Sequence, residues 1–265
     1  MANRIHPLAA VDPAADIGED CEIGPFCVIG PDVSLGAGCR LHSHVVVDGH
    51  TRIGAGCTVF PFASVGVQSQ DLKFQPGNLT YTEIGEQTLI REHVTVHSGT
   101  EDGSSTRVGS HCALLALSHV GHNCEVGDQV ILSHGATLGG HVKVEDHCNL
   151  GGLSAVHQFT RIGRNAMVAG MARVVQDVVP FTIAEGTPAA MRSINRIGMG
   201  RAGIDETDIK TVHKAFRLLF KKGVRLDEAR AQLQAEYPEH ALVQAMLAFI
   251  AASERGLARP QTGLE

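Results

Sequence analysis

An aliphatic residue falls on every sixth position of one long stretch of this chain, and this period restricts the possible folds more than any other feature. The positions run without a miss through Val108, Leu114, Val120, Val126, Leu132, Leu138, Val144, Leu150, Val156, Ile162, Val168 and Val174. A helix repeats its apolar positions near 3.6 residues and a simple strand near 2, so a period of six fits neither element. The period is typical of an all-β solenoid with very short rungs.

The same frame runs through the start of the chain. It is held by Ile5, Val11, Ile17, Ile23, Ile29, Leu35, Leu41, Val47, Ile53, Val59 and Val65. The six-residue spacing is lost across 67–83 and resumes at Ile84. Residues 98–106 lie between the repeat positions Val96 and Val108, which are twelve residues apart instead of six. Both departures are predicted to be loops on a continuous coil, and loops on a rigid scaffold often carry function.

The composition fits a thin core of small and aliphatic residues. Aromatic residues make up 4% of the chain, Trp is absent, and there are 30 glycines. The seven cysteines each lie four residues after a repeat aliphatic, at positions 21, 27, 39, 57, 112, 124 and 148. Because they occupy the small inward position and form no C-x-x-C motif, we interpret them as small buried hydrophobes rather than disulfide or metal ligands.

The pattern changes near Pro180. Residues 181–191, which include Pro188, are predicted to be a linker, and helical spacing follows. The first helix is predicted to begin at Asp205, Glu206 and Asp208 and to end near Gly223, after Lys221 and Lys222. Two more helices are predicted at about 226–236 and 239–254. The sequence therefore predicts a β-helix domain over 1–187, with loops at 67–83 and 98–106, and a C-terminal helical domain over 188–265.

Charge divides at the same boundary. Residues 1–187 hold 10 Lys and Arg against 19 Asp and Glu, a net of −9, which leaves 12 against 9, a net of +3, for residues 188–265. A basic C-terminal domain suits an acidic partner, whereas charge alone favours the simpler interpretation that these residues form solvated helix faces. The overall charge of −6 argues against nucleic-acid binding. No stretch approaches the ~20 apolar residues of a membrane span, so we expect a cytoplasmic protein without stable membrane insertion.

Histidines are predicted to gather at one edge of the coil. If three hexads make one turn, residues eighteen apart stack at a spacing of ~4.8 Å. His122, His141 and His157 follow Val120, Leu138 and Val156, so they should share one edge, with His119 on the same turn. The adjacent Gly139 and Gly140 would let a ligand approach the backbone, whose N–H groups could bind an oxyanion.

A second set of histidines, His93, His111 and His147, also shares one phase, so a histidine column could equally be a surface feature. Histidine is a natural general base near neutral pH, which permits acyl transfer to an alcohol. Three histidines equally suit Zn²⁺. No serine or cysteine lies in a recognisable nucleophile motif, so a covalent acyl-enzyme is not expected.

Several motifs together resemble the UDP-N-acetylglucosamine O-acyltransferase family. They are the hexapeptide repeats, Gly24-Pro25-Phe26, Ser43-His44-Val45-Val46-Val47, Gln70-Asp71-Leu72-Lys73-Phe74, His119-Val120-Gly121-His122, Gly140-His141, Ala155-Val156-His157-Gln158-Phe159 and the ending Arg255-Gly256-Leu257. The resemblance covers nearly the whole chain. Hexapeptides are shared by many transferases, whereas the Gln-Asp-Leu-Lys loop and the two histidine motifs are specific.

The resemblance implies a left-handed parallel β-helix, assembled as a homotrimer with active sites between subunits and without a cofactor. It implies transfer of a fatty acyl group, such as a 3-hydroxyacyl group, from acyl carrier protein to the 3-hydroxyl of UDP-N-acetylglucosamine, the first step of lipid A synthesis. It assigns His122 as general base and Gly140 as oxyanion-hole donor. Substrate contacts are assigned to Gln70, Asp71, Lys73, His119, His141, His157, Gln158, Asn195 and Arg201, and control of acyl-chain length to Gly170.

This chain departs from the family pattern at three places. Asn123 follows the expected base where the family often has Asp, and Ser98 replaces a common Arg. The Asn195–Gly203 segment lacks the acid and the Lys of the family pattern, and Ala202 replaces one of its Arg residues. Three alternatives to this function are a γ-type carbonic anhydrase-like zinc enzyme, another hexapeptide sugar acyltransferase and a non-catalytic scaffold. The zinc alternative lacks its histidine pair, because position 117 is Leu117. The acyl length and whether the acceptor is a hydroxyl or an amine stay open.

Overall fold

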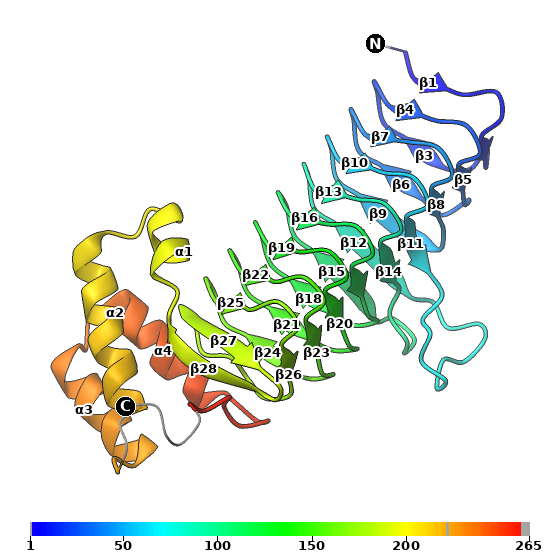
Figure 1. The fold of residues 1–265 in the computed structure, drawn as a ribbon. Helices are drawn as coiled ribbons and strands as arrows, with labels where there is room; N and C mark the ends of the chain where they lie inside the picture. Colours follow the sequence, from blue (N-terminus) through cyan, green and yellow to red (C-terminus); the bar gives the residue numbers. More distant parts are fainter. Residues whose placement is uncertain (1, 221–222, 261–265) are drawn as a thin grey trace.

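The computed structural model describes residues 2–220 and 223–260, and shows a coil of short parallel strands followed by helices (Figure 1). The strands form three sheets, named A, B and C, which make the three sides of the coil. Sheet A contains β1 (Arg4–Ile5), β4 (Glu22–Ile23), β7 (Arg40–Leu41), β10 (Thr58–Val59), β13 (Leu89–Ile90), β16 (Ala113–Leu114), β19 (Ile131–Leu132), β22 (Asn149–Leu150), β25 (Met167–Val168), β27 (Thr182–Gly186) and β28 (Ala189–Ile194). Sheet B contains β2 (Ala10–Val11), β5 (Val28–Ile29), β8 (Val46–Val47), β11 (Ser64–Val67), β14 (Thr95–His97), β17 (His119–Val120), β20 (Thr137–Leu138), β23 (Ala155–Val156) and β26 (Arg173–Val174). Sheet C contains β3 (Asp16–Ile17), β6 (Ser34–Leu35), β9 (His50–Ile53), β12 (Tyr81–Ile84), β15 (Ser105–Val108), β18 (Glu125–Val126), β21 (Lys143–Val144) and β24 (Arg161–Ile162).

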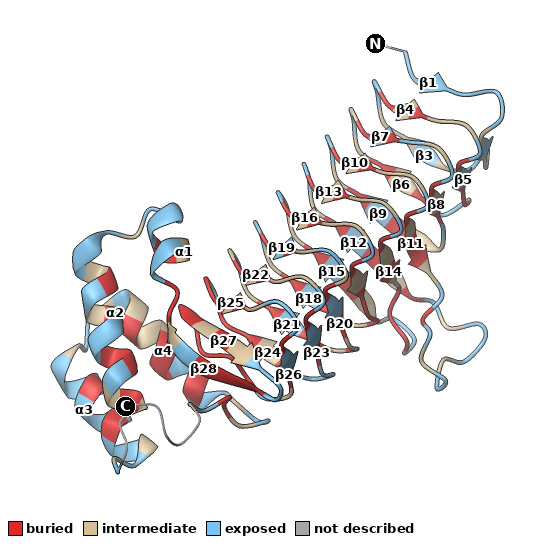
Figure 2. Ribbon diagram, viewed as in Figure 1, coloured by how far each residue is buried: buried red, intermediate tan, exposed pale blue. Residues whose placement is uncertain are grey.

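Each turn of the coil takes eighteen residues where no loop intervenes. His119 pairs in parallel with Thr137, and Thr137 pairs with Ala155. The prediction that three hexads make one turn is therefore confirmed. The repeat aliphatics between Val108 and Val174 are all buried, and so are the seven cysteines, which are free thiols (Figure 2). Short rungs can thus stack into one continuous core, and its buried hydrophobic residues from Cys21 to Val179 include no aromatic residue, whereas Phe181 is fully buried at the C-terminal end of the coil.

The residue three places after a repeat aliphatic often takes a left-handed backbone conformation at the corner between two sheets. Asn123 has φ of 59° and His141 has φ of 60°. Asn and His are among the residues that tolerate this region best. His93, His111 and His147 also occupy this position, but His93 follows a strand of sheet A and the other two follow strands of sheet C. The prediction that these three histidines form one column was therefore wrong.

Both predicted loops leave the coil at the corner between sheets B and C. The first connects β11 to β12 and the second connects β14 to β15, and both project from the same side of the coil in Figure 1. Each is shorter than predicted, because its last residues already pair as strands: β12 begins at Tyr81 and β15 at Ser105. Thr58 pairs with Leu89, a separation of 31 residues (89 − 58), so the first loop adds to one turn of eighteen without disturbing the register.

The segment predicted to be a linker is a β-hairpin. The strands β27 and β28 pair antiparallel and extend sheet A at its C-terminal end. The linker prediction for 181–191 was wrong, because Pro188 lies in the turn of this hairpin and does not interrupt a strand. The proposed boundary between residues 187 and 188 falls in the same turn, and the division into two domains stays a prediction.

Four helices follow the hairpin. They are α1 (Arg196–Arg201), α2 (Glu206–Leu219), α3 (Leu226–Glu236) and α4 (Ala241–Ala251). The Asp205 side chain caps α2 by accepting from the backbone N–H groups of Thr207 and Asp208. The three predicted helices are confirmed, whereas α1 was not predicted; the predicted end at Lys221 and Lys222 lies outside the described residues. No helix in the described ranges is long and apolar enough to cross a membrane.

Candidate active site

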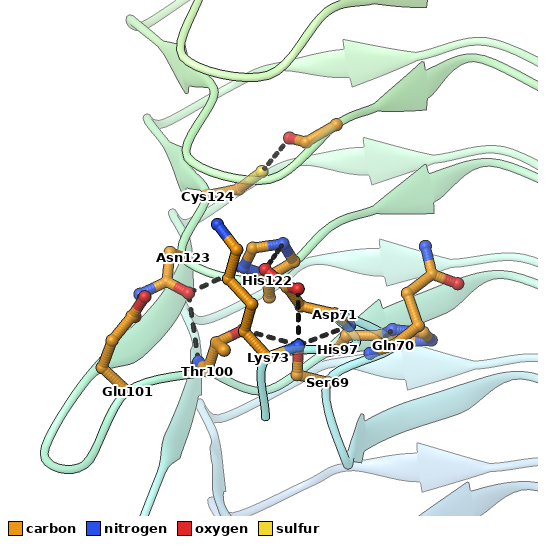
Figure 3. A network of polar contacts seen from close by, with 12 residues as sticks. Ser69, Gln70, Asp71, Lys73, His97, Thr100, Glu101, His122, Asn123 and Cys124 are labelled. Carbon is orange, nitrogen blue, oxygen red and sulfur yellow. Dashed lines mark hydrogen bonds and ion pairs between the residues drawn. The ribbon is translucent and has the colours of Figure 1, made fainter. Parts of the chain in front are cut away.

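The two loops and the histidine edge meet at one place on the coil. Both loops leave from the corner between sheets B and C, on the two turns that precede His122. Gly140 and His141 lie at the same corner one turn further on, and His157 and Gln158 one turn beyond them. The predicted gathering of histidines at this edge is present in the structure. In Figure 3, residues of the first loop, including Asp71 and Lys73, lie against His122.

His122 is held between two side chains. Its exposed fraction is 8%, its Nδ1 lies 2.9 Å from Asn123 Oδ1, and its Nε2 lies 3.6 Å from Asp71 Oδ2. The backbone N–H of Thr100 donates to the same Asn123 Oδ1 at 3.1 Å, which identifies that atom as the acceptor oxygen. His122 Nδ1 must therefore carry the proton, so the lone pair of the neutral imidazole lies on Nε2. Nε2, the nitrogen with the lone pair, is the one that faces the first loop.

Gly140 provides the space for this imidazole. A Cβ atom at position 140 would lie 2.3 Å from His122 Nε2 and 2.5 Å from Cε1. Among the described residues, the neighbouring N–H groups of Gly139 and His141 donate to Val156 and His122, whereas that of Gly140 has no backbone acceptor. The N–H of Gly140 is thus available to a ligand beside the histidine, which fits a donor to a developing oxyanion.

His119 has a different role from His122. It is on β17, where its Nδ1 lies 2.7 Å from Thr95 Oγ1 and its Nε2 lies 3.2 Å from the Gln70 amide nitrogen. Because that amide can only donate, the lone pair of Nε2 is engaged. Burial, helped by His97 and His122, lowers the pKa of His119 to about 4, so it is neutral at pH 7. His119 therefore fixes the first loop and is not placed to act as the base.

The first loop is folded by local hydrogen bonds around Asp71. The N–H of Asp71 donates to Ser69 Oγ at 3.1 Å, and Asp71 Oδ1 accepts from the N–H of Lys73 at 2.9 Å. Ser69 Oγ also lies 2.6 Å from Thr100 Oγ1, and both side chains are buried between the two loops. These contacts direct the other Asp71 oxygen at His122 and leave the Lys73 side chain exposed (Figure 3).

Sequence reasoning missed the contribution of the second loop. Glu101 accepts a hydrogen bond from Asn123 Nδ2 at 3.0 Å, and Thr100 binds the same amide through its backbone. Ser98, one of the departures, is buried and accepts from Thr80 Oγ1 at 3.0 Å, so a small side chain fits this place. The available signal was the double interval before Val108, which placed 98–106 on the turn next to His122 without indicating which residues turn inward.

The C-terminal side of the site is lined by His141 and Phe159. The His141 ring packs on its edge against His122 at a centroid distance of 5.2 Å and stacks on Phe159 at 4.6 Å. Burial first, and then the nearby His122, lower the pKa of His141. His157 is exposed one turn further, with its Nδ1 3.1 Å from the Gln158 carbonyl oxygen.

Three predicted residues lie elsewhere in the single chain. Gly170 lies after β25, at the corner between sheets A and B. Asn195 and Arg201 line a pocket of about 690 Å³ between sheet A and α1. Both polar atoms of the Asn195 side chain have internal partners, since Oδ1 accepts from Gly198 and Nδ2 donates to the Asn165 carbonyl. One chain therefore does not bring these three residues to His122.

The site offers proton-transfer chemistry and holds no grouped metal ligands. Within 2–220 and 223–260, no three His, Cys, Asp or Glu side chains are arranged to bind a metal ion. Cys124, the thiol nearest in sequence to His122, is buried and donates to the Gly139 carbonyl at 3.1 Å. Burial raises its pKa to about 12, so it is a poor nucleophile at neutral pH. The Nε2 lone pair of His122 is a basic group that this corner presents for proton transfer.

Comparisons with known proteins agree on one family. The family model described as Udp N-acetylglucosamine O-acyltransferase, Domain 2, matches residues 177–258, and the one described as bacterial transferase hexapeptide matches residues 14–49. An acyl-(acyl-carrier-protein)–UDP-N-acetylglucosamine O-acyltransferase from Akkermansia muciniphila is 48% identical over 96% of this chain and 98% of its own length.

Solved structures agree with the sequence relatives. The structure of LpxA from Acinetobacter baumannii is 42% identical, covers 96% of this chain and 99% of its own, and superposes with a TM-score of 0.92. That of UDP-N-acetylglucosamine O-acyltransferase from Moraxella catarrhalis is 38% identical, with coverage of 96% and 99% and a TM-score of 0.91. The predicted fold class, a left-handed parallel β-helix with a C-terminal helical domain, is confirmed.

Proposed function

We propose a general-base mechanism at His122 for this chain, which belongs to the UDP-N-acetylglucosamine O-acyltransferase family. It is an enzyme that transfers an acyl group from acyl carrier protein to UDP-N-acetylglucosamine. The resemblance places this reaction at the first step of lipid A synthesis, on the 3-hydroxyl of the sugar. The observation that carries the mechanism is the acceptor Asn123 Oδ1 beside His122 Nδ1, which assigns the proton to Nδ1 and the lone pair to Nε2 at the loop-lined corner.

In the proposed reaction, His122 Nε2 takes the proton of the sugar hydroxyl as the oxygen attacks the acyl carbonyl. The N–H of Gly140 donates to the oxyanion that forms on that carbonyl. The bond from the acyl carbon to the carrier then breaks, and the imidazolium returns the proton to the leaving group. Transfer is proposed to be direct, because the seven cysteines are buried free thiols and no serine or cysteine lies in a recognisable nucleophile motif.

The experiment that tests this function combines purified protein, UDP-N-acetylglucosamine and acyl carrier proteins loaded with chains of different length. We expect mass spectrometry to detect a nucleotide sugar that carries one ester-linked acyl group. Absence of that product with every donor would contradict the proposed acceptor. The zinc-enzyme alternative gains no support from the geometry, since the described residues contain no metal-ligand group.

Lys73 is proposed to bind the nucleotide sugar. It is exposed on the first loop, two residues from Asp71, and offers a point charge to a phosphate or carbonyl oxygen. We expect Lys73→Ala to raise KM for UDP-N-acetylglucosamine about tenfold, because one charge-assisted hydrogen bond is lost, with a smaller effect on kcat. Steady-state kinetics checks this.

A matched control for Lys73 is Lys143→Ala, which removes the same charge from sheet C, where Lys143 pairs with Glu125 at 2.8 Å. Lys143→Ala should leave KM near the wild-type value. Equal KM values for the two variants and the wild type would show that the first loop does not bind the nucleotide sugar through Lys73.

The complete site is proposed to form in a homotrimer. Gly170 lies at the corner between sheets A and B, and His122 at the corner between sheets B and C, so a second subunit is needed to bring such residues together. The corner between sheets A and B also carries a column of exposed apolar side chains: Phe26, Phe62, Leu117, Leu153 and Met171. A monomer would leave this column in water, which favours its burial against another copy.

Gly170 is proposed to limit the length of the acyl chain. A Cβ atom at this position would lie 3.3 Å from the nearest atom, the Gly152 carbonyl oxygen, so a side chain can be added with a small shift. We expect Gly170→Met to move donor preference toward shorter acyl chains, because added volume at the end of a groove excludes the last carbons. Product profiles across donor lengths check this, and identical profiles for wild type and variant would place the limit elsewhere.

The remaining parts of the proposal concern partners and location. The excess of basic residues over 188–265 suits an acidic carrier protein. His157, Gln158, Asn195 and Arg201 are proposed to contact substrate, the last two from a neighbouring subunit. We infer a cytoplasmic enzyme, since both proposed substrates are water-soluble molecules of that compartment.

A further inference from the structure

The side of His122 that faces away from the proposed substrate leads to a carboxylate. Asn123 Oδ1 accepts from His122 Nδ1, and Asn123 Nδ2 donates to Glu101 Oε2 at 3.0 Å. We propose that Glu101 is a positioning residue that acts through the Asn123 amide and stabilises the positive charge that forms on His122 when Nε2 takes a proton. This inference rests on the proposed function of His122 as the base.

The Asn123 amide is held in one orientation. Its oxygen accepts from two donors, the backbone N–H of Thr100 and Nδ1 of His122. Its own backbone N–H donates to Thr106 Oγ1 at 2.8 Å. An amide has one oxygen and one NH₂ group, so with the oxygen toward His122 the NH₂ group must point the other way, to Glu101. If the amide were flipped, its NH₂ group would face two other donors, the N–H of Thr100 and the Nδ1–H of His122. Its oxygen would then face the Glu101 carboxylate, so Glu101 opposes the flip.

Glu101 lies on the Nδ1 side of His122, and Nδ1 is not the nitrogen that takes the proton in the proposed reaction. Asp71 is also near, but it faces Nε2 at 3.6 Å, on the side where the substrate hydroxyl must approach. The other titratable groups around His122 are Lys73, His97, His119 and His141. The pKa values of the three histidines are lowered, first by burial, so these rings are mainly neutral at pH 7. Glu101 is thus the carboxylate that can assist the imidazolium without occupying the substrate position.

The fold of the second loop does not depend on the Glu101 side chain. The loop is anchored by Asp102, whose Oδ1 accepts from the N–H of Leu79 at 2.8 Å, and by Asn78, whose side chain donates to the Thr100 carbonyl at 2.9 Å. Ser104 Oγ donates to the backbone carbonyl of Glu101, which any side chain retains. Glu101 itself is exposed, so its replacement should yield a folded protein.

The first test removes only the charge. Glu101→Gln keeps an oxygen that accepts from Asn123, so the amide orientation survives. We expect kcat to fall about threefold to tenfold, because hydrogen bonds to ionised groups are stronger but are screened at an exposed site. KM values for both substrates should not change, since the charge on His122 develops after binding. Asp102→Asn is the matched control: it removes one carboxylate from the same loop, keeps the acceptor for Leu79, and should leave kcat within about twofold of wild type.

The second test asks whether the effect passes through Asn123. In the Asn123→Asp variant, the new carboxylate contacts His122 directly. It also repels the Glu101 carboxylate, which in the wild type accepts a hydrogen bond from the Asn123 amide. Adding Glu101→Gln to that background relieves the repulsion, so kcat should stay equal or rise. We therefore expect Glu101→Gln to lower kcat when Asn is at position 123, and to leave kcat unchanged or raise it when Asp is at that position.

Three outcomes would overturn the inference. The first two are that Glu101→Gln matches Asp102→Asn in the wild-type background, or that Glu101→Gln lowers kcat equally in both backgrounds. Failure of the proposed function is distinguishable, because it would appear as retained turnover in a variant that lacks the His122 imidazole. A change of KM without a change of kcat in Glu101→Gln would also reject the proposal, since it would place Glu101 in substrate binding.

Discussion

Replacing His122 by alanine is expected to lower kcat by about 10²–10⁴-fold, the range that a positioned general base contributes. The expectation follows from the tautomer: Asn123 fixes the proton on Nδ1, and Nε2 is then the basic nitrogen at the corner where the two loops meet. His119 cannot substitute, because its own Nε2 is engaged by Gln70 and its pKa is lowered to about 4 by burial. Single-turnover kinetics with saturating donor measures the loss at the chemical step.

The matched control for His122 is His111→Asn, at a corner between other sheets. His111 has φ of 56°, a left-handed conformation that Asn tolerates, so this variant removes a histidine without straining the backbone. It should keep wild-type turnover. If a folded His122→Ala protein turned over at the wild-type rate, the general-base mechanism would be wrong, whatever the residues around His122 do.

The solenoid could be predicted from the sequence because the inward positions of a coil obey a strict spacing. Once Val120, Leu138 and Val156 define one column, the placement of His122, His141 and His157 at one edge follows from counting. The loops were placed on the correct turns for the same reason. The hairpin of β27 and β28 was missed, because antiparallel pairing across Pro188 leaves no six-residue period to detect.

The contacts within the site could not be predicted in this way. Spacing along the coil places Asn123 beside His122, but whether its amide oxygen faces the ring depends on Thr100, which lies on a loop outside the repeat. Glu101 is likewise brought to Asn123 by the path of that loop. Gly170 is a different case, because part of its placement could be predicted from the repeat. Its distance along the axis could be counted, while its position at the corner between sheets A and B places it away from His122 within one chain.

The structure also gives Gly140 a role that its N–H alone does not explain. The family resemblance assigns it as an oxyanion donor, and an alanine at this position would keep that N–H. A Cβ atom there would nevertheless lie 2.3 Å from His122 Nε2, far inside contact distance. The imidazole would have to move by roughly 1 Å, and a displacement of that size at a reacting group can cost about 10² in rate.

Gly140→Ala is therefore expected to lower kcat by about 10²-fold while the protein remains folded, since the displaced group is the end of a side chain and not the backbone. Gly152→Ala is the matched control. Gly152 occupies the same hexad position on another corner, and a Cβ atom there would meet its nearest neighbour, the His134 carbonyl oxygen, at 3.4 Å, an ordinary contact. Its melting temperature should stay near that of wild type, which would show that a methyl group at this hexad position does not by itself unfold the coil.

The double variant His122→Ala/Gly140→Ala decides how the glycine acts. If Gly140 serves by leaving room for the imidazole, its replacement has nothing further to displace once the ring is gone, so the double variant should be about as active as His122→Ala alone. Independent effects would instead multiply, and the double variant would lose a further factor of about 10². That larger loss would mean that a side chain at position 140 blocks the substrate or the oxyanion directly.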